Sequence, residues 1–240
     1  MKKKILIVLP TLNEDRNISV LYKKIRSLRI PLDLLFIDDG SNDNTIEIIK
    51  KIAKNKNKKI KIFLKKRYKR LGIGKAHKDG LNFGYKKKYN FAITMDSDLA
   101  HDPKYINNLL KHSQKFDLVL GSRFLAKKSY ENLSLIRIFL SEVAHFFTKF
   151  LFGHKFDSTN AFRCYNLKKI NKDFLKECKS NHYDFFFTSI TILNYKKHSI
   201  HQFPMIISGR SYGSTKMELK HAIRSFLMMF RLFFQIKIKI

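Results

Sequence analysis

Short apolar runs alternate with helix-like segments along the first half of this 240-residue chain. The apolar runs, which are typical of short buried strands, cover residues 4–9, 32–37, 60–64, 91–95 and 117–120. The segments whose apolar residues recur every three or four positions cover residues 17–29, 45–53, 75–85 and 103–111. This alternation predicts an α/β fold, in which a mostly parallel sheet carries helices on both faces. Ligands of such sheets bind beside the carboxyl ends of the strands, so the loops after the strands are the first place to seek a functional site.

Two longer apolar segments, residues 133–152 and 218–236, mark the second half. Polar residues recur every three or four positions in the first of them, namely Ser134, Arg137, Ser141, His145 and Thr148. One side of the second carries Lys220, Arg224, Arg231 and Gln235. A wide apolar face with a basic stripe is typical of helices on a membrane surface, although two core-packing helices would show a similar pattern. We expect a catalytic domain over residues 1–217, with an interfacial helix at 133–152, and a membrane-surface helix at 218–240.

The expected location is the cytoplasm, at the cytosolic face of a membrane. No segment reaches the roughly 20 nearly uninterrupted apolar residues of a membrane span, and no secretory signal is visible. The two cysteines, Cys164 and Cys178, are too few for a disulfide framework and are expected to be reduced thiols.

The formal net charge of +30 favours anionic partners, namely nucleic acid, anionic lipid or phosphorylated substrates. A general bias of the source toward lysine would produce the same excess, so charge alone does not decide the function. Hydrophobic residues make up 44% of the chain, which excludes a wholly disordered protein.

Polar clusters follow the first two predicted strands. Pro10, Leu12, Asn13 and Glu14 come directly after the first strand. Asp38, Asp39 and Gly40 come after the second, where two adjacent carboxylates could accept hydrogen bonds from a base and a ribose. Part of this second cluster has another reading, because Asp43 or Asn44 could cap the helix that follows.

The sharpest cluster is Asp96-Ser97-Asp98, directly after the apolar run 91–95. Two carboxylates one residue apart at the exit of a strand can together hold a hard divalent cation. Mg²⁺ and Mn²⁺ favour oxygen ligands and often complete their shells with phosphate and water. We therefore predict a metal–diphosphate site at Asp96 and Asp98.

Cations with neighbouring glycines complete the set of candidates. Residues 67–75 form a basic loop that contains Arg70, Gly74 and Lys75. Its spacing does not match a P-loop, and no dinucleotide-binding glycine motif follows the first strand. Four further cations are suited to phosphate, and these are Arg123, Arg163, Arg210 and Lys216.

Together these segments resemble the inverting nucleotide-sugar glycosyltransferases of the GT-A fold, and within them the dolichyl-phosphate mannose synthases and related polyprenyl-phosphate glycosyltransferases. The matching segments are LPTLNE at 9–14, IDDGS at 37–41, LGIGKA at 71–76, MDSDLAHDP at 95–103, GSRF at 121–124, FR at 162–163 and RSYGSTK at 210–216. The last two favour the lipid-phosphate branch.

The resemblance implies a role for each matching residue. Asp96 and Asp98 would bind Mg²⁺ or Mn²⁺ and the diphosphate, and with Arg123 and Arg210 they form the expected catalytic set. Nucleotide and substrate contacts are expected from Pro10, Leu12, Asn13, Glu14, Asp38, Asp39, Gly40, Arg70, Gly74 and Ala76. The acceptor phosphate or donor diphosphate is expected to meet Arg123, Arg163, Arg210 and Lys216.

Two positions depart from the family pattern. Ala100 stands where some relatives have a glutamine that contacts the metal, which affects the expected metal affinity. Thr188 lies in a segment where relatives carry a glutamate, which affects the expected preference for acceptor or sugar.

The expected function is transfer of a hexose, foremost mannose from GDP-mannose, to a polyprenyl phosphate at an anionic membrane surface. Many lipid-phosphate relatives have membrane spans, so a membrane-spanning partner protein is one expectation. UDP-glucose or another nucleotide sugar, with a lipid, protein or glycan acceptor, is the enzymatic alternative. A basic nucleic-acid-binding protein would explain the charge but not the clustered carboxylates, which repel phosphate backbones.

Overall fold

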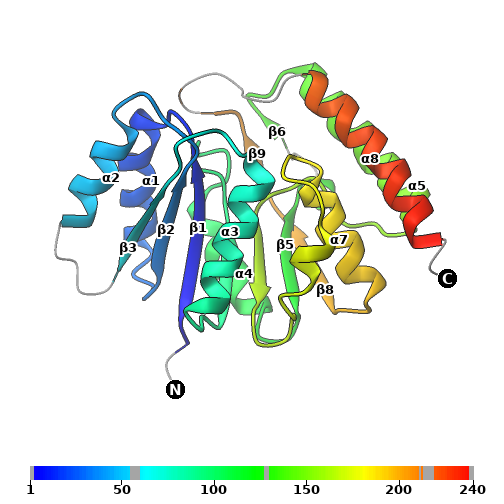
Figure 1. The fold of residues 1–240 in the computed structure, drawn as a ribbon, viewed down its shortest axis with the longest axis horizontal. Coiled ribbons are helices and arrows are strands. Elements are labelled where there is room, and N and C mark those ends of the chain that lie inside the picture. The colour runs from blue at the N-terminus through cyan, green and yellow to red at the C-terminus, as the bar shows by residue number, and fades with distance from the viewer. Residues whose placement is uncertain (1–2, 55–59, 127–129, 211, 213–218, 238–240) are drawn as a thin grey trace.

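A seven-stranded sheet forms the centre of the computed structural model, which describes residues 3–54, 60–126, 130–210, 212 and 219–237 (Figure 1). Its strand order is β3-β2-β1-β4-β7-β5-β8. The strands are β1 (Ile5–Thr11), β2 (Asp33–Asp38), β3 (Ile62–Lys66), β4 (Phe91–Thr94), β5 (Leu118–Ser122), β7 (Arg163–Asn166) and β8 (Ile200–Pro204). All neighbouring pairs are parallel except those of β7, which runs antiparallel to both β4 and β5.

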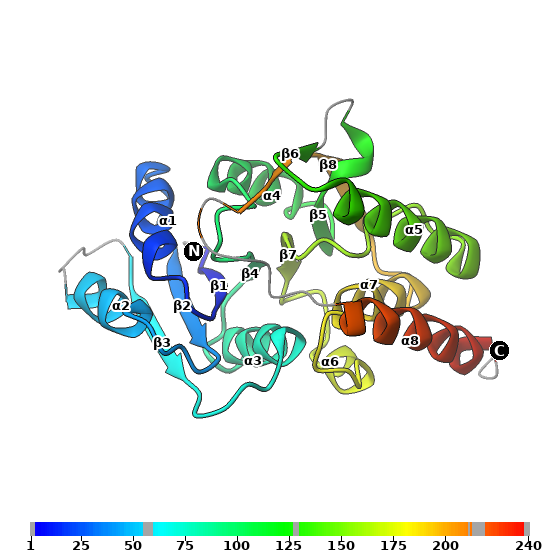
Figure 2. The same cartoon turned by 90° about the horizontal axis from the view of Figure 1, so that it is seen from above.

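Helices cover both faces of the sheet, as the alternating pattern predicts (Figure 2). One face packs against α1 (Asp15–Ser27), α2 (Thr45–Lys54) and α4 (Ile106–His112). The other packs against α3 (Ile73–Lys86), α6 (Phe174–Glu177) and α7 (Phe185–Tyr195). Single 3-10 turns, η1 (Pro103–Tyr105) and η2 (Arg123–Leu125), lead out of the loops after β4 and β5. The predicted capping of α2 is confirmed, because the Asp43 carboxylate accepts a hydrogen bond from the Thr45 amide at 3.0 Å.

The antiparallel strand β7 is the main feature of the sheet that the apolar pattern misses. Its four residues, Arg163 to Asn166, are all buried, yet only two of them are apolar. It lies between β4 and β5, so the run at 117–120 forms a strand that does not adjoin β4. The architecture is therefore a mostly parallel, mixed sheet flanked by helices.

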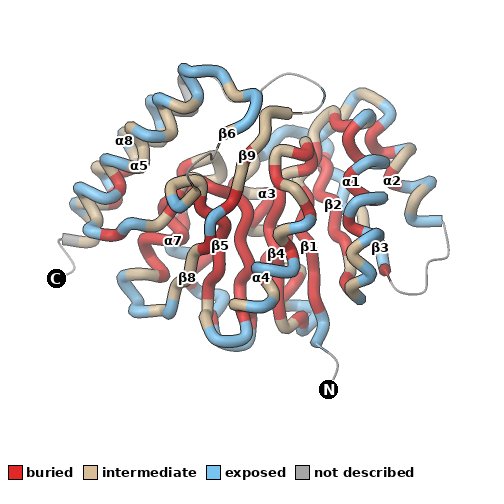
Figure 3. Tube along the Cα trace, turned by 180° about the vertical axis from the view of Figure 1, so that it is seen from behind, coloured by how far each residue is buried: buried red, intermediate tan, exposed pale blue. Residues whose placement is uncertain are grey.

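Two long helices lie side by side along one end of the molecule, and these are α5 (Leu135–Phe152) and α8 (Leu219–Lys237) (Figure 1). They contact each other through Phe147 and Phe226, whose ring centroids are 4.9 Å apart. Exposed residues run along both helices, in contrast to the buried sheet (Figure 3). A short ladder of β6 (Tyr130–Glu131) and β9 (Ile207–Ser208) connects the sheet to this region. Within the described ranges, no helix combines the length and the apolar character needed to cross a membrane.

Candidate active site

The loops after β1, β2 and β4 converge at the carboxyl edge of the sheet. The Ser97 hydroxyl donates to the Pro10 carbonyl at 2.8 Å, and the Asp39 amide donates to the Thr11 carbonyl at 2.9 Å. Asn13 adopts a left-handed conformation, with φ of 52°, and its side-chain oxygen accepts from the Asn42 amide at 3.0 Å. The first three predicted clusters therefore meet in one place, as the rule for parallel sheets requires.

An acidic group forms the centre of this edge. The Arg210 guanidinium binds the Glu14 carboxylate and also lies 3.4 Å from Oδ2 of Asp98. Glu14 is 5% exposed and also accepts from the Asn17 side chain at 2.6 Å. Arg210 follows β9, far along the chain from Glu14, so the fold brings the two ends of the predicted motif set together.

Asp96 lies beside Asp98 with its side chain 30% exposed. The pKa of Asp96 is raised to about 6, chiefly by burial and also by the nearby carboxylates of Asp98 and Glu14, whereas His101 and Arg210 oppose the shift. The ring of His101 is buried, and its Nδ1 accepts from the Asp96 amide at 3.2 Å. The site therefore crowds negative charge into a partly desolvated space, which favours a proton or a cation there.

The turn that presents Asp98 is strained and held by burial. Leu99 has a φ of 67°, which is uncommon for a residue other than glycine, and it is 8% exposed within the core. Such a conformation costs on the order of 1–3 kcal/mol and persists when packing determines it. The Ala100 amide donates to Oδ1 of Asp98 at 3.1 Å, which fixes the carboxylate further.

The donor set fits a divalent cation of the Mg²⁺ or Mn²⁺ type. Asp96 and Asp98 supply hard oxygen ligands, and their mutual crowding is relieved when a cation replaces the proton. Among the residues that the structure describes, no group of three or more His, Cys, Asp or Glu side chains is arranged to hold a metal. The fit therefore rests on two carboxylates, a number that suits a metal whose remaining ligands are phosphate and water.

Asp38 and Asp39 lie at the edge, but internal groups already bind both carboxylates. Asp38 is fully buried and accepts from the amides of Gly40 and Ser41. Asp39 accepts from Arg67 at 2.9 Å and from the amides of Leu71 and Gly72 at 3.0 and 3.1 Å. These contacts tie the loop after β2 to the basic loop at 67–75.

The start of α3 packs closely against the loop at Asn181 and His182. A Cβ on Gly74 would lie 2.4 Å from the His182 carbonyl, and the Lys75 amide donates to the Asn181 carbonyl at 3.0 Å. Gly74 is therefore required for close packing with the residues before α7. The predicted neighbours differ in exposure, because Ala76 is buried and Arg70 is exposed.

Tyr183 belongs to the site, although no sequence motif points to it. Burial raises the pKa of Tyr183 to about 12, and the charges of Asp96, Arg210, Asp98 and Arg137 all act on its hydroxyl. Arg137 comes from the first turns of α5. Tyr183 therefore connects the acidic group to the beginning of the helix pair.

Arg123 is expected at a phosphate, but its guanidinium is bound internally. It forms two 2.9 Å bonds with the buried Asp157 and donates to Ser141 and Thr159 at 2.7 Å. Burial alone would raise the pKa of Asp157, but the Arg123 charge and hydrogen bonds lower it below its usual range. In this structure Arg123 therefore anchors α5, and a substrate phosphate would have to displace these partners.

Arg163, also expected at a phosphate, is enclosed by the core in this structure. Its side chain is fully buried and donates to the carbonyls of Asn160 and Ser158 and to the Ser189 hydroxyl. In this arrangement Arg163 stabilises the core beside β7, and a phosphate would have to displace these partners. The position of Lys216 lies outside the described residues.

The two departures from the family pattern lie in different surroundings. Ala100 follows the Asp98 turn directly and is partly exposed. Thr188 is 5% exposed, and its hydroxyl donates to the Asp184 carbonyl of its own helix at 2.7 Å. Thr188 therefore has no free polar group directed at the acidic centre.

Comparison with known proteins decides the family. Residues 6–178 match the family model described as glycosyl transferase family 2. The chain belongs to glycosyl transferase family 2. A polyprenol monophosphomannose synthase from Mycolicibacterium smegmatis is 26% identical to it over 214 residues, which are 88% of this chain and 80% of that protein. This family 2 chain is therefore a glycosyltransferase.

Solved structures agree on the fold of this family 2 enzyme. A glucosyl-3-phosphoglycerate synthase from Mycobacterium tuberculosis, in complex with Mn²⁺, UDP-glucose and glycerol 3-phosphate, matches with a TM-score of 0.62 and 17% identity, over 95% of this chain and 80% of that one. A mannosyltransferase from Pyrobaculum calidifontis, in complex with GDP-mannose and Mn²⁺, matches with a TM-score of 0.59 and 15% identity, over 96% and 65%.

Proposed function

We propose that this enzyme transfers a hexose, foremost mannose from GDP-mannose, from a nucleotide sugar to a polyprenyl phosphate, with inversion at the anomeric carbon. The observation that carries the proposal is the meeting of Asp96, Asp98, Glu14 and Arg210 at the carboxyl edge of a family 2 sheet. The similarity to a polyprenol monophosphomannose synthase supports the choice of sugar and acceptor.

Asp96 and Asp98 would hold Mg²⁺ or Mn²⁺, which would neutralise the charge that develops on the leaving diphosphate. Mn²⁺ accompanies the nucleotide sugar in the two solved complexes, which supports this assignment. Arg210 would add a second positive charge beside the same carboxylates.

The nucleoside would lie over the loops after β1 and β2. Pro10, Leu12 and Asn13 border this region, and Asn13 is fixed by its bonds to the loop after β2. The Asp39 carboxylate already accepts hydrogen bonds from the amides of Leu71 and Gly72. A base would therefore share this carboxylate with the two amides or replace their hydrogen bonds. Gly40 and Arg70 are exposed beside it.

The acceptor needs no strong general base, because a lipid monophosphate is an anionic nucleophile near neutral pH. The enzyme has to align it with the anomeric carbon, opposite the leaving diphosphate. Arg137 of α5 and the charged residues of the acidic centre all act on the Tyr183 hydroxyl, so the side between the acidic centre and the start of α5 is where an acceptor phosphate would enter.

The helix pair supports action at an anionic membrane surface on the cytosolic face. The polar stripe of α5 turns inward, since Ser141 binds Arg123 and the buried Thr148 binds Ser158. The opposite side exposes large apolar residues, including Phe146 at 62% and Phe150 at 74%. This arrangement reverses that of a helix on a water-soluble domain and matches a helix whose outer solvent is lipid.

A donor panel tests the proposal. Polyprenyl phosphate is incubated with radiolabelled GDP-mannose, UDP-glucose or UDP-N-acetylglucosamine, with and without Mg²⁺, and label is counted in the organic extract. We expect Mg²⁺-dependent label from GDP-mannose above that from the other donors. A higher count from UDP-glucose would refute mannose while preserving the reaction class, and label confined to water-soluble product would refute the lipid acceptor.

A further inference from the structure

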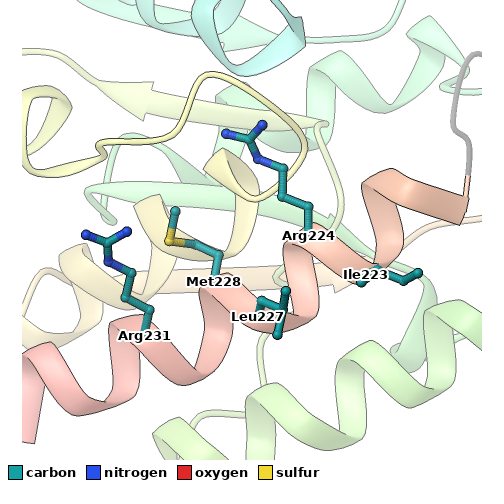
Figure 4. Close-up of a pocket in the computed structure, with 5 residues that line it drawn as sticks. All are labelled: Ile223, Arg224, Leu227, Met228 and Arg231. Atoms are coloured by element: carbon teal, nitrogen blue, oxygen red, sulfur yellow. The ribbon is translucent and has the colours of Figure 1, made fainter.

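A hollow lies on the exposed side of α8 and combines cationic with apolar walls (Figure 4). It has a volume of about 450 Å³ and is lined by Ile223, Arg224, Leu227, Met228 and Arg231. These positions recur at helical spacing along one face. The other face of α8 carries Met229 and Leu232, which are 3% and 7% exposed and pack with Phe187 of α7. The orientation of α8 is therefore fixed by its core. Met228 also packs against this cluster, so the hollow lies at the border between the packed face of α8 and its exposed side.

The two arginines of the hollow act together. Arg224 and Arg231 are two helical turns apart, roughly 10 Å along the axis, and both are exposed. Figure 4 shows both side chains leaving α8 on the same side as Met228, which lies between them. Residues 219–240 contain no Asp or Glu. A guanidinium binds phosphate oxygens in a two-pronged manner, so this pair suits a phosphate-bearing ligand.

Apolar surface adjoins the arginines and continues onto α5. On α8, Ile223, Leu227 and Phe234 are 54%, 65% and 58% exposed. On α5, the exposed large residues are Leu135, Ile136, Phe139, Phe146 and Phe150. Eight exposed large apolar side chains on two adjacent helices are unusual on a monomeric soluble domain and mark a region of interaction. Nucleic acid would match the cations but leave these eight side chains in water.

We propose that Arg224 and Arg231 bind the headgroup of an anionic phospholipid while its hydrocarbon lies against Ile223 and Leu227. A phospholipid carries both chemistries that the hollow presents, a phosphate and an apolar chain. The site is separate from the acidic centre and would hold the helix pair on the bilayer in one orientation. It deepens the membrane part of the proposed function and rests on it, but it makes no use of the donor sugar.

Vesicle binding of the full chain tests the lipid site. Sedimentation is measured with vesicles of phosphatidylcholine alone and with vesicles containing phosphatidylglycerol. For the double variant Arg224→Gln, Arg231→Gln we expect roughly 30-fold weaker binding to the anionic vesicles. Binding to phosphatidylcholine should change little. The matched control removes the same charge from α2, at the other end of the molecule, with Lys50→Gln and Lys54→Gln (Figure 1).

A specific site predicts that the control keeps nearly all of its affinity for anionic vesicles. An equal loss in both double variants would show that net charge alone drives binding, and an unchanged arginine variant would show that the hollow holds no lipid headgroup. Either result overturns the proposal. Because the assay contains no donor sugar, failure of glycosyl transfer and failure of the lipid site are separate results.

A fluorescence measurement locates the apolar part of the contact. The chain contains no tryptophan, so Leu227→Trp introduces a single reporter. We expect its emission to shift to shorter wavelength on anionic vesicles and to be quenched by lipids with brominated chains. Tyr68→Trp, at a position that is 98% exposed in the loop after β3, should show neither effect. Emission from Leu227→Trp that stays unchanged while the protein binds vesicles would contradict the assignment.

Discussion

The carboxyl edge of the sheet and the α5–α8 pair use polar residues in opposite ways. At the sheet edge, Asp96, Asp98 and Arg210 face outward from an apolar core, in the usual arrangement of a site on an α/β fold. On α5, Ser141 and Thr148 face inward, and phenylalanines face outward. The difference is the one expected if, as proposed, the sheet edge meets water and substrate while the outer side of α5 meets hydrocarbon.

The largest effect is expected at the sheet edge. Asp98→Ala should lower the transfer rate by at least about 1,000-fold, because it removes a metal ligand and the partner of Arg210. Its melting temperature should stay close to that of the wild type. The measurement is the steady-state rate at saturating donor and Mg²⁺.

Asp102→Ala is the matched control in the same loop. Asp102 accepts from the Lys104 amide and is 37% exposed, away from the acidic centre. It should keep most of the activity. Full activity in Asp98→Ala would remove the metal assignment, and equal losses in both variants would point to disruption of the loop.

The next effect concerns the anchor of α5. Arg123→Met leaves the fully buried Asp157 without its charged partner, so we expect a loss of about 3–5 kcal/mol in unfolding free energy. The pKa of Asp157 is lowered in the folded state, so its stabilisation is present above its unfolded pKa and is lost as the pH falls through the folded value. Urea unfolding at pH 7 and at pH 3 measures both effects.

The double variant Arg123→Met, Asp157→Leu sharpens this prediction. It removes both charges and should recover part of the lost stability. If Arg123→Met instead keeps full stability but loses transfer, Arg123 is a phosphate ligand as the sequence suggests, and its internal bonds are incidental.

A pH effect is expected at Asp96, whose pKa is raised to about 6. Because a proton competes with the metal for the carboxylate, Mn²⁺ affinity should be constant above pH 7 and fall toward about tenfold per unit below pH 6. Titration calorimetry between pH 5 and 8 measures this. Asp96→Asn should bind Mn²⁺ weakly with a flatter pH profile, and an identical profile would assign the titration to another group.

The smallest effects test the reversal on α5 directly. Ser141→Ala should destabilise the fold by about 1–3 kcal/mol, because it removes a hydrogen bond to the charged Arg123. Phe150→Ser should change stability by less than about 0.5 kcal/mol, because its ring is 74% exposed. Chemical unfolding of both variants makes the comparison. A larger cost for Phe150→Ser would mean that this ring is buried in solution.

Apart from β8, whose residues IHQFP are mixed in polarity and mostly only partly buried, the sequence predicts the parallel part of the fold well, because each of these strands is a short apolar run between amphipathic helices. It also predicts that Pro10, Asp39, Asp96 and Asp98 share one edge, since each follows a strand. It does not predict β7, because the buried residues of this strand include the polar Arg163 and Asn166. Periodicity identifies a polar stripe on α5 but cannot tell which stripe faces the domain, because the contact that orients the helix runs from Ser141 to Arg123 and on to Asp157, and Asp157 lies in no motif.

The roles of individual cations are the least predictable part of the site. Arg123, Arg163 and Arg210 all occur in family-like motifs, yet their partners differ. Arg163 donates to backbone carbonyls, and Arg123 binds the Asp157 carboxylate. Of the three arginines, only Arg210 reaches the acidic centre. These outcomes depend on long-range packing. Tyr183 was missed for the same reason.

The most direct test of the account is the mass of the lipid after reaction. Vesicles carrying polyprenyl phosphate are incubated with the enzyme, GDP-mannose and Mn²⁺, and the mass of the extracted lipid is measured by mass spectrometry. Reactions with EDTA and with Asp98→Ala are the controls. The account predicts a gain of one hexose on the lipid phosphate that disappears in both controls. Lipid of unchanged mass after incubation with folded enzyme would contradict the account. So would the same amount of product with and without EDTA.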